Sequence, residues 1–215
     1  MAKPVRERSS AMKRALIIID VQNDYIDGTL PIAFPPAEQS LANIGRAMDG
    51  ARTHDIPVVA VQNILPGNAP FMARGSRGAE LHGVVTDRGW DLLVTKHLPS
   101  ALWGTGLDTW LRERQIDTLT VAGYMTHNCD LSTVIHGAHA GYRMELLSDA
   151  TGALPYANRA GSATAEELHR ASCVVMQARF AAVLTTGEWL ACLATGDAPV
   201  RDTIFDSHQR ALTNV

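Results

Sequence analysis

Cys129 lies where a thiol can act as a nucleophile. It follows a short apolar run over residues 119–123 that predicts a buried strand, and helical periodicity begins just after it at Leu131. Asn128 is a suitable cap for that helix. The positive end of a helix dipole favours thiolate, so the position predicts an activated cysteine. The alternative is that Cys129 is a small buried apolar residue, as cysteines usually are.

Two other reactive side chains, Asp20 and Lys96, end predicted strands. Because ligands of an open parallel sheet bind beyond the carboxyl ends of its strands, these side chains and Cys129 are expected at one rim. A carboxylate can accept the thiol proton, and a lysine ammonium can stabilise both anions. Backbone N–H groups in the turn before the helix can hold a developing oxyanion. The combination indicates nucleophilic catalysis by cysteine.

Asp20 and Lys96 also have purely structural interpretations. Asp20 can cap the turn after its strand, and Lys96 can be a solvated strand end. Neither interpretation accounts for all three positions, so the catalytic interpretation is preferred.

Apolar runs alternate with helical patterns along the chain and predict an α/β fold. Runs that are apolar throughout are typical of parallel strands buried on both faces. Strands are expected over residues 15–20, 56–62, 91–96, 118–123, 142–149 and 181–186. Helices are expected over residues 37–53, 106–115 and 165–180, and from Cys129 onward.

The same pattern predicts the organisation of the chain. Residues 14–195 are expected to form one domain, after a disordered tail over residues 1–13. Residues 196–215 are expected to be a tail or an oligomerisation arm. The Gly/Pro-rich segment 64–83 predicts a long loop, and such loops in compact domains are often functional.

Composition excludes several classes of protein. Apolar residues make up 46% and charged residues 19% of the chain, which is typical of a globular protein. The net charge of -3 argues against nucleic acid or an acidic membrane surface as a partner. The three cysteines are widely spaced, so we expect a reducing compartment and a cytoplasmic protein. No apolar run approaches the length of a membrane span, and the charged N-terminus does not resemble a secretory signal.

Three blocks of the sequence carry a resemblance to a known family. ALIIIDVQNDY, KHLPSALWGTGLD and VAGYMTHNCDLSTVIHGAHAGY resemble the signature blocks of the isochorismatase-like cysteine hydrolases. That family includes nicotinamidases, N-carbamoylsarcosine amidohydrolase and maleamate amidohydrolase. The resemblance runs from about Arg14 to Thr186. It implies that Asp20, Lys96 and Cys129 form a triad that hydrolyses a small amide or another C–N bond through a thioester.

The resemblance also implies structural features. It implies a three-layer, Rossmann-like fold with six parallel strands in the order 3-2-1-4-5-6, and a homodimer or homotetramer. A non-prolyl cis peptide is expected between Tyr124 and Met125, with the N–H groups of Met125 and Cys129 forming the oxyanion hole. True isochorismatases of this family lack the cysteine, so Cys129 favours amide hydrolysis over vinyl-ether hydrolysis.

One departure from the family concerns metal. Nicotinamidases carry a metal site after the second strand, with an Asp-x-His pair and a further histidine. Gln62 and Asn63 cannot replace those ligands, and His82 stands alone. His136 and His139 lie off the apolar stripe of their helix and are expected at the surface. We therefore predict a hydrolase that needs neither metal nor cofactor.

Five side chains are weaker candidates for the substrate pocket. Tyr25 and Trp103 flank the triad in sequence and can wall a pocket for a flat or apolar amide, with ordinary core packing as the alternative. His127 either lines the pocket or caps its own turn. Arg74 and Arg77 can meet a substrate carboxylate, although loop arginines are more often solvated.

Two other function classes stay open. In the first, Cys129 is a redox or sensor thiol, although no cysteine near it in sequence is available to resolve it. In the second, the fold is a small-molecule binding module without catalysis. Peroxide consumption would favour the first, and tight binding without turnover would favour the second.

Overall fold

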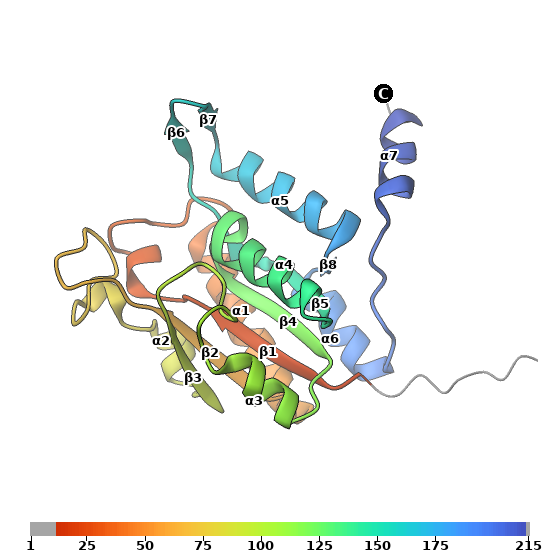
Figure 1. The fold of residues 1–215 in the computed structure, drawn as a ribbon, viewed down its shortest axis with the longest axis horizontal. Coiled ribbons are helices and arrows are strands. Elements are labelled where there is room, and N and C mark those ends of the chain that lie inside the picture. Colours follow the sequence, from red (N-terminus) through yellow and green to blue (C-terminus); the bar gives the residue numbers. More distant parts are fainter. Residues whose placement is uncertain (1–11, 214–215) are drawn as a thin grey trace, which may run out of the picture.

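A parallel sheet of six strands forms the centre of the molecule (Figure 1), seen in a computed structural model that describes residues 12–213. The strand order is β3-β2-β1-β4-β5-β8, which confirms the predicted order once the strands of this sheet are counted along the chain. All neighbouring pairs are parallel. The strands are β1 (Arg14–Ile19), β2 (Val58–Asn63), β3 (Leu92–Lys96), β4 (Thr118–Tyr124), β5 (Arg143–Gly152) and β8 (Ala182–Leu184).

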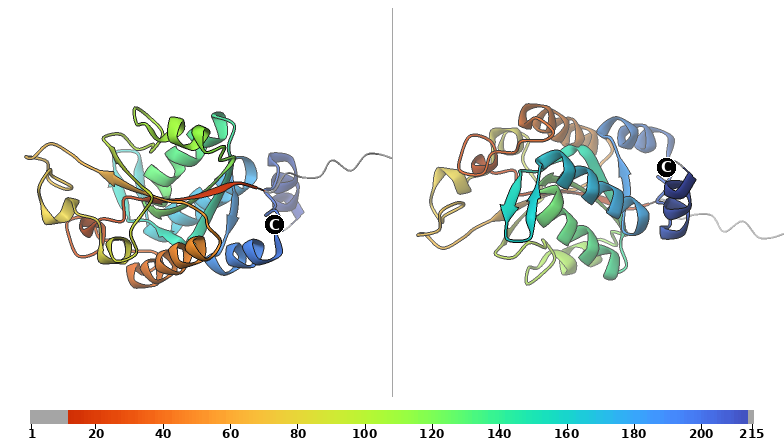
Figure 2. Two further views of the ribbon diagram at one scale, coloured as in Figure 1. Left: turned by 90° about the horizontal axis from the view of Figure 1, so that it is seen from below. Right: turned by 90° about the horizontal axis from the view of Figure 1, so that it is seen from above.

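Helices cover both faces of the sheet and complete the predicted three layers (Figure 2). One face carries α1 (Ala37–Thr53) and α6 (Thr186–Thr195), with the short α2 (Gly83–Thr86) beside α1. The opposite face carries α3 (Leu107–Glu113), α4 (Leu131–His139) and α5 (Ala165–Arg179).

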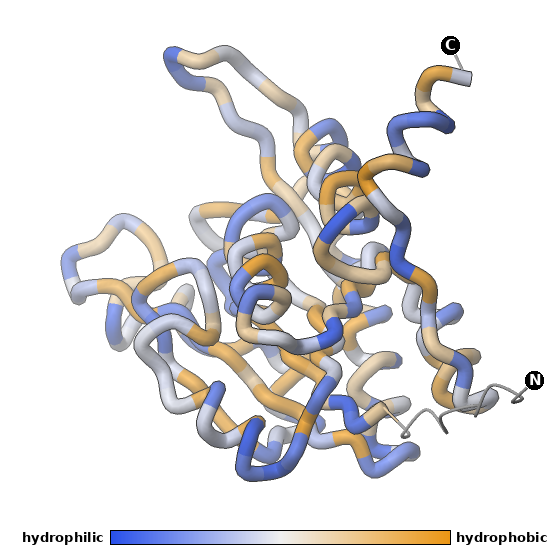
Figure 3. Tube along the Cα trace, turned by 45° about the vertical axis from the view of Figure 1, so that its right-hand side comes forward, coloured by the Kyte–Doolittle hydropathy of each residue, from blue (hydrophilic) through white to orange (hydrophobic). Residues whose placement is uncertain are grey.

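The side chains of β1 show why two helical layers are needed. Successive residues of a strand point to opposite faces, and every position of β1 is apolar after Arg14. Leu16 and Ile18 pack with α1 and α6, whereas Ile17 and Ile19 pack with α3, α4 and α5. The apolar strands accordingly run through the interior in Figure 3. Burial on both faces explains the continuous apolar runs in the sequence.

Two features of the C-terminal half of the chain differ from the prediction. The expected strand over 181–186 ends early, because Thr185 begins α6 with a capping box that it forms with Glu188. A hairpin of β6 (Tyr156–Asn158) and β7 (Gly161–Ala163) precedes α5 and was not predicted. Its strands are short and largely exposed, so they carry no hydrophobic run.

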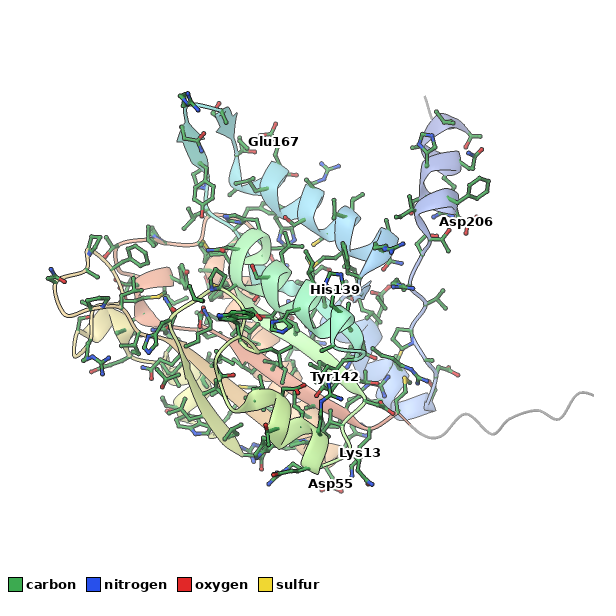
Figure 4. The ribbon with its side chains drawn as sticks, viewed as in Figure 1. Lys13, Asp55, His139, Tyr142, Glu167 and Asp206 are labelled. Atoms are coloured by element: carbon green, nitrogen blue, oxygen red, sulfur yellow. The ribbon has the colours of Figure 1, made fainter. Side chains whose placement is uncertain are left out.

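The last helix, α7 (Ile204–Thr213), stands apart from the sheet, as the position of Asp206 shows (Figure 4). None of the ten residues described for α7 is buried. The oligomerisation arm and the predicted dimer or tetramer stay predictions. Of the expected tail over residues 1–13, residues 1–11 lie outside the described part of the chain. Among the described residues, no helix has the length and apolar character that crossing a membrane requires.

A buried ion pair ties β1, β4 and β5 to α6. The guanidinium of Arg14 donates from Nη2 to Oε1 of Glu145 at 2.9 Å, and both side chains are almost wholly buried. The carboxylate also accepts hydrogen bonds from Thr120 Oγ1 at 2.7 Å and Trp189 Nε1 at 3.0 Å. Such a pair is costly to break because the remaining charge has no water around it.

Glu145→Ala is therefore expected to lower the free energy of unfolding by about 3–5 kcal/mol, the usual range for removing one partner of a buried pair. Urea denaturation followed by circular dichroism measures this change. Asp27→Ala is the matched control, because it breaks the exposed pair between Asp27 and Arg77 and should change stability little. Equal effects of the two substitutions would contradict the prediction.

Candidate active site

Asp20 lies directly after β1, at the point where the strand order reverses between β1 and β4. Its backbone N–H donates to Val61 O at 2.9 Å, which continues the pairing of β1 with β2. Its φ is 50°, in the left-handed region that aspartate tolerates better than most residues. The chain thus turns away from the strand while the carboxyl group is wholly buried.

Gly123 allows β4 to approach the end of β1. A Cβ atom at this position would lie 2.0 Å from the backbone oxygen of Ile19, and φ is 121°. Only glycine avoids both the clash and the unfavourable conformation. The close approach brings the segment that carries Cys129 next to the segment that carries Asp20.

Cys129 lies in a π-helical turn, Thr126–Asp130, that precedes α4. The peptide between Tyr124 and Met125 is cis, as the resemblance implies. The N–H groups of Asn128 and Asp130 both donate to Met125 O, at 3.0 and 3.2 Å. The expectation that Asn128 caps the helix is wrong, because α4 begins at Leu131, after the turn.

The structure brings the three predicted catalytic side chains together. The ammonium Nζ of Lys96, at the end of β3, lies 2.6 Å from Asp20 Oδ2 and 3.3 Å from Cys129 Sγ. The exposed fractions of Asp20, Lys96 and Cys129 are 0%, 1% and 4%. The lysine therefore bridges the carboxylate and the sulfur in a nearly dry environment.

Burial controls the protonation of this cluster. It raises the pKa of the Asp20 carboxyl, and the Lys96 ammonium opposes that shift. Burial alone would lower the pKa of Lys96, but the charges of Asp20 and Cys129 outweigh it and raise that pKa. For Cys129, burial and then the Asp20 carboxylate raise the thiol pKa, and Lys96 offsets them only in part.

The raised pKa of Cys129 corrects the expectation from sequence. A helix N-terminus alone would favour thiolate. Here the sulfur is buried beside a carboxylate, so the resting group is a thiol. A thiol that must lose its proton needs a base nearby, and the Asp20 carboxylate shares the Lys96 ammonium with the sulfur.

A cavity of about 360 Å³ opens onto this cluster. Tyr25, Met125 and Asn128 line it together with Lys96 and Cys129. Its other walls are side chains of the surrounding loops and of β2 and β6: Leu30, Asn63, Leu65, Phe71, His97, Leu98, Pro99, Leu154 and Tyr156.

Other predicted pocket residues lie elsewhere. Trp103 is 62% exposed and lies outside the cavity lining; it lines a neighbouring surface hollow with His136. His127 packs its ring edge-on against Tyr156, with ring centroids 4.8 Å apart, and lies outside the cavity lining. Arg74 and Arg77 also lie outside the lining, and Arg77 pairs with Asp27.

The histidines and amides considered for metal have other partners. Gln62 donates to Ala79 O at 2.7 Å, and His82 Nδ1 caps α2 by accepting from Val84 N at 3.1 Å. His136 bonds Ser100 Oγ at 2.9 Å, whereas His139 is exposed on α4 (Figure 4). Within residues 12–213, no three His, Cys, Asp or Glu side chains are arranged to hold a metal ion.

Sequence reasoning missed two residues near the site. Tyr156, from the short hairpin, closes one side of the cavity. Asp130, next to the nucleophile, is wholly buried, and its carboxylate accepts a hydrogen bond from Thr151. Burial raises the pKa of Asp130 to about 7. A carboxylate directly after the cysteine was visible in the sequence, but its burial was not.

Comparison with known proteins places the chain in a family. The isochorismatase domain model matches residues 14–188. An uncharacterised isochorismatase-family protein of Bacillus subtilis, YddQ, is 30% identical over 181 residues, which cover 83% of this chain and 99% of YddQ. The ureidoacrylate amidohydrolase of Methylobacterium radiotolerans is 29% identical over 221 aligned residues, covering 82% of this chain and 79% of the enzyme.

A solved structure agrees with these matches. A protein of Burkholderia xenovorans LB400 with a provisional isochorismatase assignment is 56% identical, with a TM-score of 0.94. The similarity covers 95% of this chain and 99% of that chain. The chain described here therefore belongs to the isochorismatase family.

Proposed function

We propose that this protein hydrolyses a small amide or another C–N bond through a thioester on Cys129. One observation carries the proposal. The buried ammonium of Lys96 contacts both the Asp20 carboxylate and the Cys129 sulfur, next to a cavity. The similarity to an amidohydrolase supports the reaction class.

In the first half-reaction, Asp20 accepts the proton of the Cys129 thiol as the sulfur attacks the amide carbon. The N–H groups of Met125 and Cys129, in the turn at the cavity, hold the negative oxygen of the tetrahedral intermediate. The C–N bond then breaks, and ammonia or an amine leaves with the proton that Asp20 returns. Lys96 stabilises the negative charge on Asp20 and sulfur throughout.

In the second half-reaction, water hydrolyses the thioester. Asp20 removes a proton from the water, the oxygen attacks the carbonyl carbon, and the Cys129 sulfur leaves and regains its proton. The products are a carboxylic acid and ammonia or an amine. The low exposure of the triad keeps the charges in a medium where each interaction is stronger than in water.

Ammonia release from a panel of primary amides and N-carbamoyl compounds tests the proposal. Turnover of at least one compound is expected, with accumulation of an acyl adduct on Cys129 detectable by mass spectrometry after rapid quenching. Peroxide consumption without any amide turnover would instead support the redox function. Tight binding of an amide that is never hydrolysed would support a binding module.

Activity is also expected to survive prolonged dialysis against EDTA. The proposed chemistry uses only the side chains of the triad, and the segment after β2 lacks the Asp-x-His pair of the metal-dependent relatives. Steady-state rates before and after dialysis measure the effect, and metal analysis of both samples is the control. Loss of activity with recovery on adding zinc would contradict the prediction.

A further inference from the structure

The cavity above Cys129 is walled mostly by apolar and aromatic side chains. They come from separate loops and from β6, so they line the space above the nucleophile from several sides. These side chains are Tyr25, Leu30, Leu65, Phe71, Leu98, Pro99, Met125, Leu154 and Tyr156. A volume of about 360 Å³ is enough for a small organic molecule.

Within the part of the chain that the structure describes, the site offers an anionic substrate no free lysine or arginine. Among the described residues, Lys96 is the only lysine or arginine in the lining, and it already contacts Asp20 and Cys129. A second buried carboxyl group belongs to Asp130, the residue that follows the nucleophile in sequence. His97, which also lines the cavity, donates from Nδ1 to the carbonyl oxygen of Ile64 at 2.7 Å.

A carboxylate on the substrate would therefore lose its hydration without gaining a free cationic partner among the described lining residues. Burying an unpaired charge is strongly unfavourable, and the nearby Asp20 carboxylate adds repulsion. Apolar groups, in contrast, gain from leaving water in such a cavity.

We propose that the cavity selects uncharged amides with an apolar or aromatic substituent and excludes amides that carry a carboxylate. This substrate class rests on the proposed hydrolase function. It also separates this chain from the ureidoacrylate amidohydrolase that it resembles, because the substrate named for that enzyme is itself a carboxylate.

Alkylation of Cys129 tests the selection without requiring a substrate. Iodoacetamide and iodoacetate are nearly equal in size and differ in charge. Their rates at Cys129, followed at pH 8 by peptide mass spectrometry, are compared with their rates at the same cysteine in urea. The folded protein is expected to favour iodoacetamide by at least about tenfold more than the unfolded chain does, because like charges brought close together repel each other. The same ratio of iodoacetamide to iodoacetate rates in the folded protein and in urea would overturn the proposal.

Matched substrates test the same point in hydrolysis. Hexanamide and the methyl ester of adipamate are expected to be turned over, whereas adipamate itself is not. Hydrolysis of adipamate at a rate similar to that of hexanamide would overturn the proposed selection while supporting the hydrolase function. If no amide is hydrolysed but the alkylation preference holds, the hydrolase function fails and the neutral, apolar character of the site stands.

A positive charge placed on the wall of the cavity should abolish the discrimination against iodoacetate. Leu98 lines the cavity and is 51% exposed, so Leu98→Arg adds a cation without disturbing the core. This variant is expected to react with iodoacetate almost as fast as with iodoacetamide. Leu93→Arg is the control, because Leu93 is 42% exposed on β3 and lies outside the lining. Unchanged discrimination in Leu98→Arg, or an equal change in Leu93→Arg, would overturn the proposal.

Discussion

Replacing Cys129 with alanine is expected to lower amide turnover by at least about 10⁴-fold, as loss of a nucleophile does in related mechanisms. The substitution removes one sulfur atom from the floor of the cavity and leaves Asp20 and Lys96 in contact, so substrate binding should persist. Ammonia release measures turnover, and calorimetry with a slowly hydrolysed amide measures binding.

Cys192→Ala is the matched control. Cys192 is a half-buried cysteine on α6, on the face of the sheet covered by α1. Its loss should leave turnover near that of the unmodified protein. Near-normal hydrolysis by Cys129→Ala, or equal losses in the two variants, would show that the nucleophile is misassigned.

Asp20→Asn is expected to lower turnover by about 10²–10⁴-fold, the usual contribution of a general base. Asparagine keeps the shape of the side chain and tolerates the positive φ at this position. The effect on the thiol should be the reverse of the effect on turnover. Burial is the first cause of the raised thiol pKa of Cys129, and the Asp20 charge is the second, so removing that charge lowers the pKa.

The rate of iodoacetamide alkylation against pH separates these two effects. In the unmodified protein the rate should still rise above pH 8.5, where an ordinary thiol is about half ionised. In Asp20→Asn the midpoint should move to lower pH by about one unit or more, as expected when a nearby like charge is removed.

Lys96→Met is expected to shift the alkylation midpoint in the direction opposite to Asp20→Asn. It removes the cation that partly offsets the raised thiol pKa, so the midpoint should move to higher pH. Turnover should also fall, because a neutral side chain cannot stabilise Asp20 and the thiolate. Movement of both midpoints in one direction, or full turnover in Asp20→Asn, would contradict the assigned functions of these side chains.

The sequence by itself was sufficient for the central sheet. Apolar residues at every position of β1 after Arg14 predict burial on both faces, and local periodicity carries that information. The positions of Asp20 and Lys96 at strand ends also follow from the sequence, because parallel strands place their carboxyl ends at one edge. The same reasoning places Cys129 after β4.

The walls of the cavity were decided by tertiary structure. Trp103 is near the triad in sequence but lies on the outer surface, whereas Tyr156 is distant in sequence and lines the cavity. Loops have no periodicity that indicates their direction, and a three-residue strand such as β6 has no hydrophobic run. Their positions depend on contacts between segments far apart in the chain.

The protonation of the nucleophile was also decided by tertiary structure. The sequence shows Cys129 near the start of a helix, which favours thiolate through a local dipole. In the folded chain the sulfur is buried near Asp20, and desolvation and the Asp20 charge raise the pKa of the thiol and keep it protonated. Desolvation and charge contacts depend on what packs around a group, and that information exists only in the folded chain.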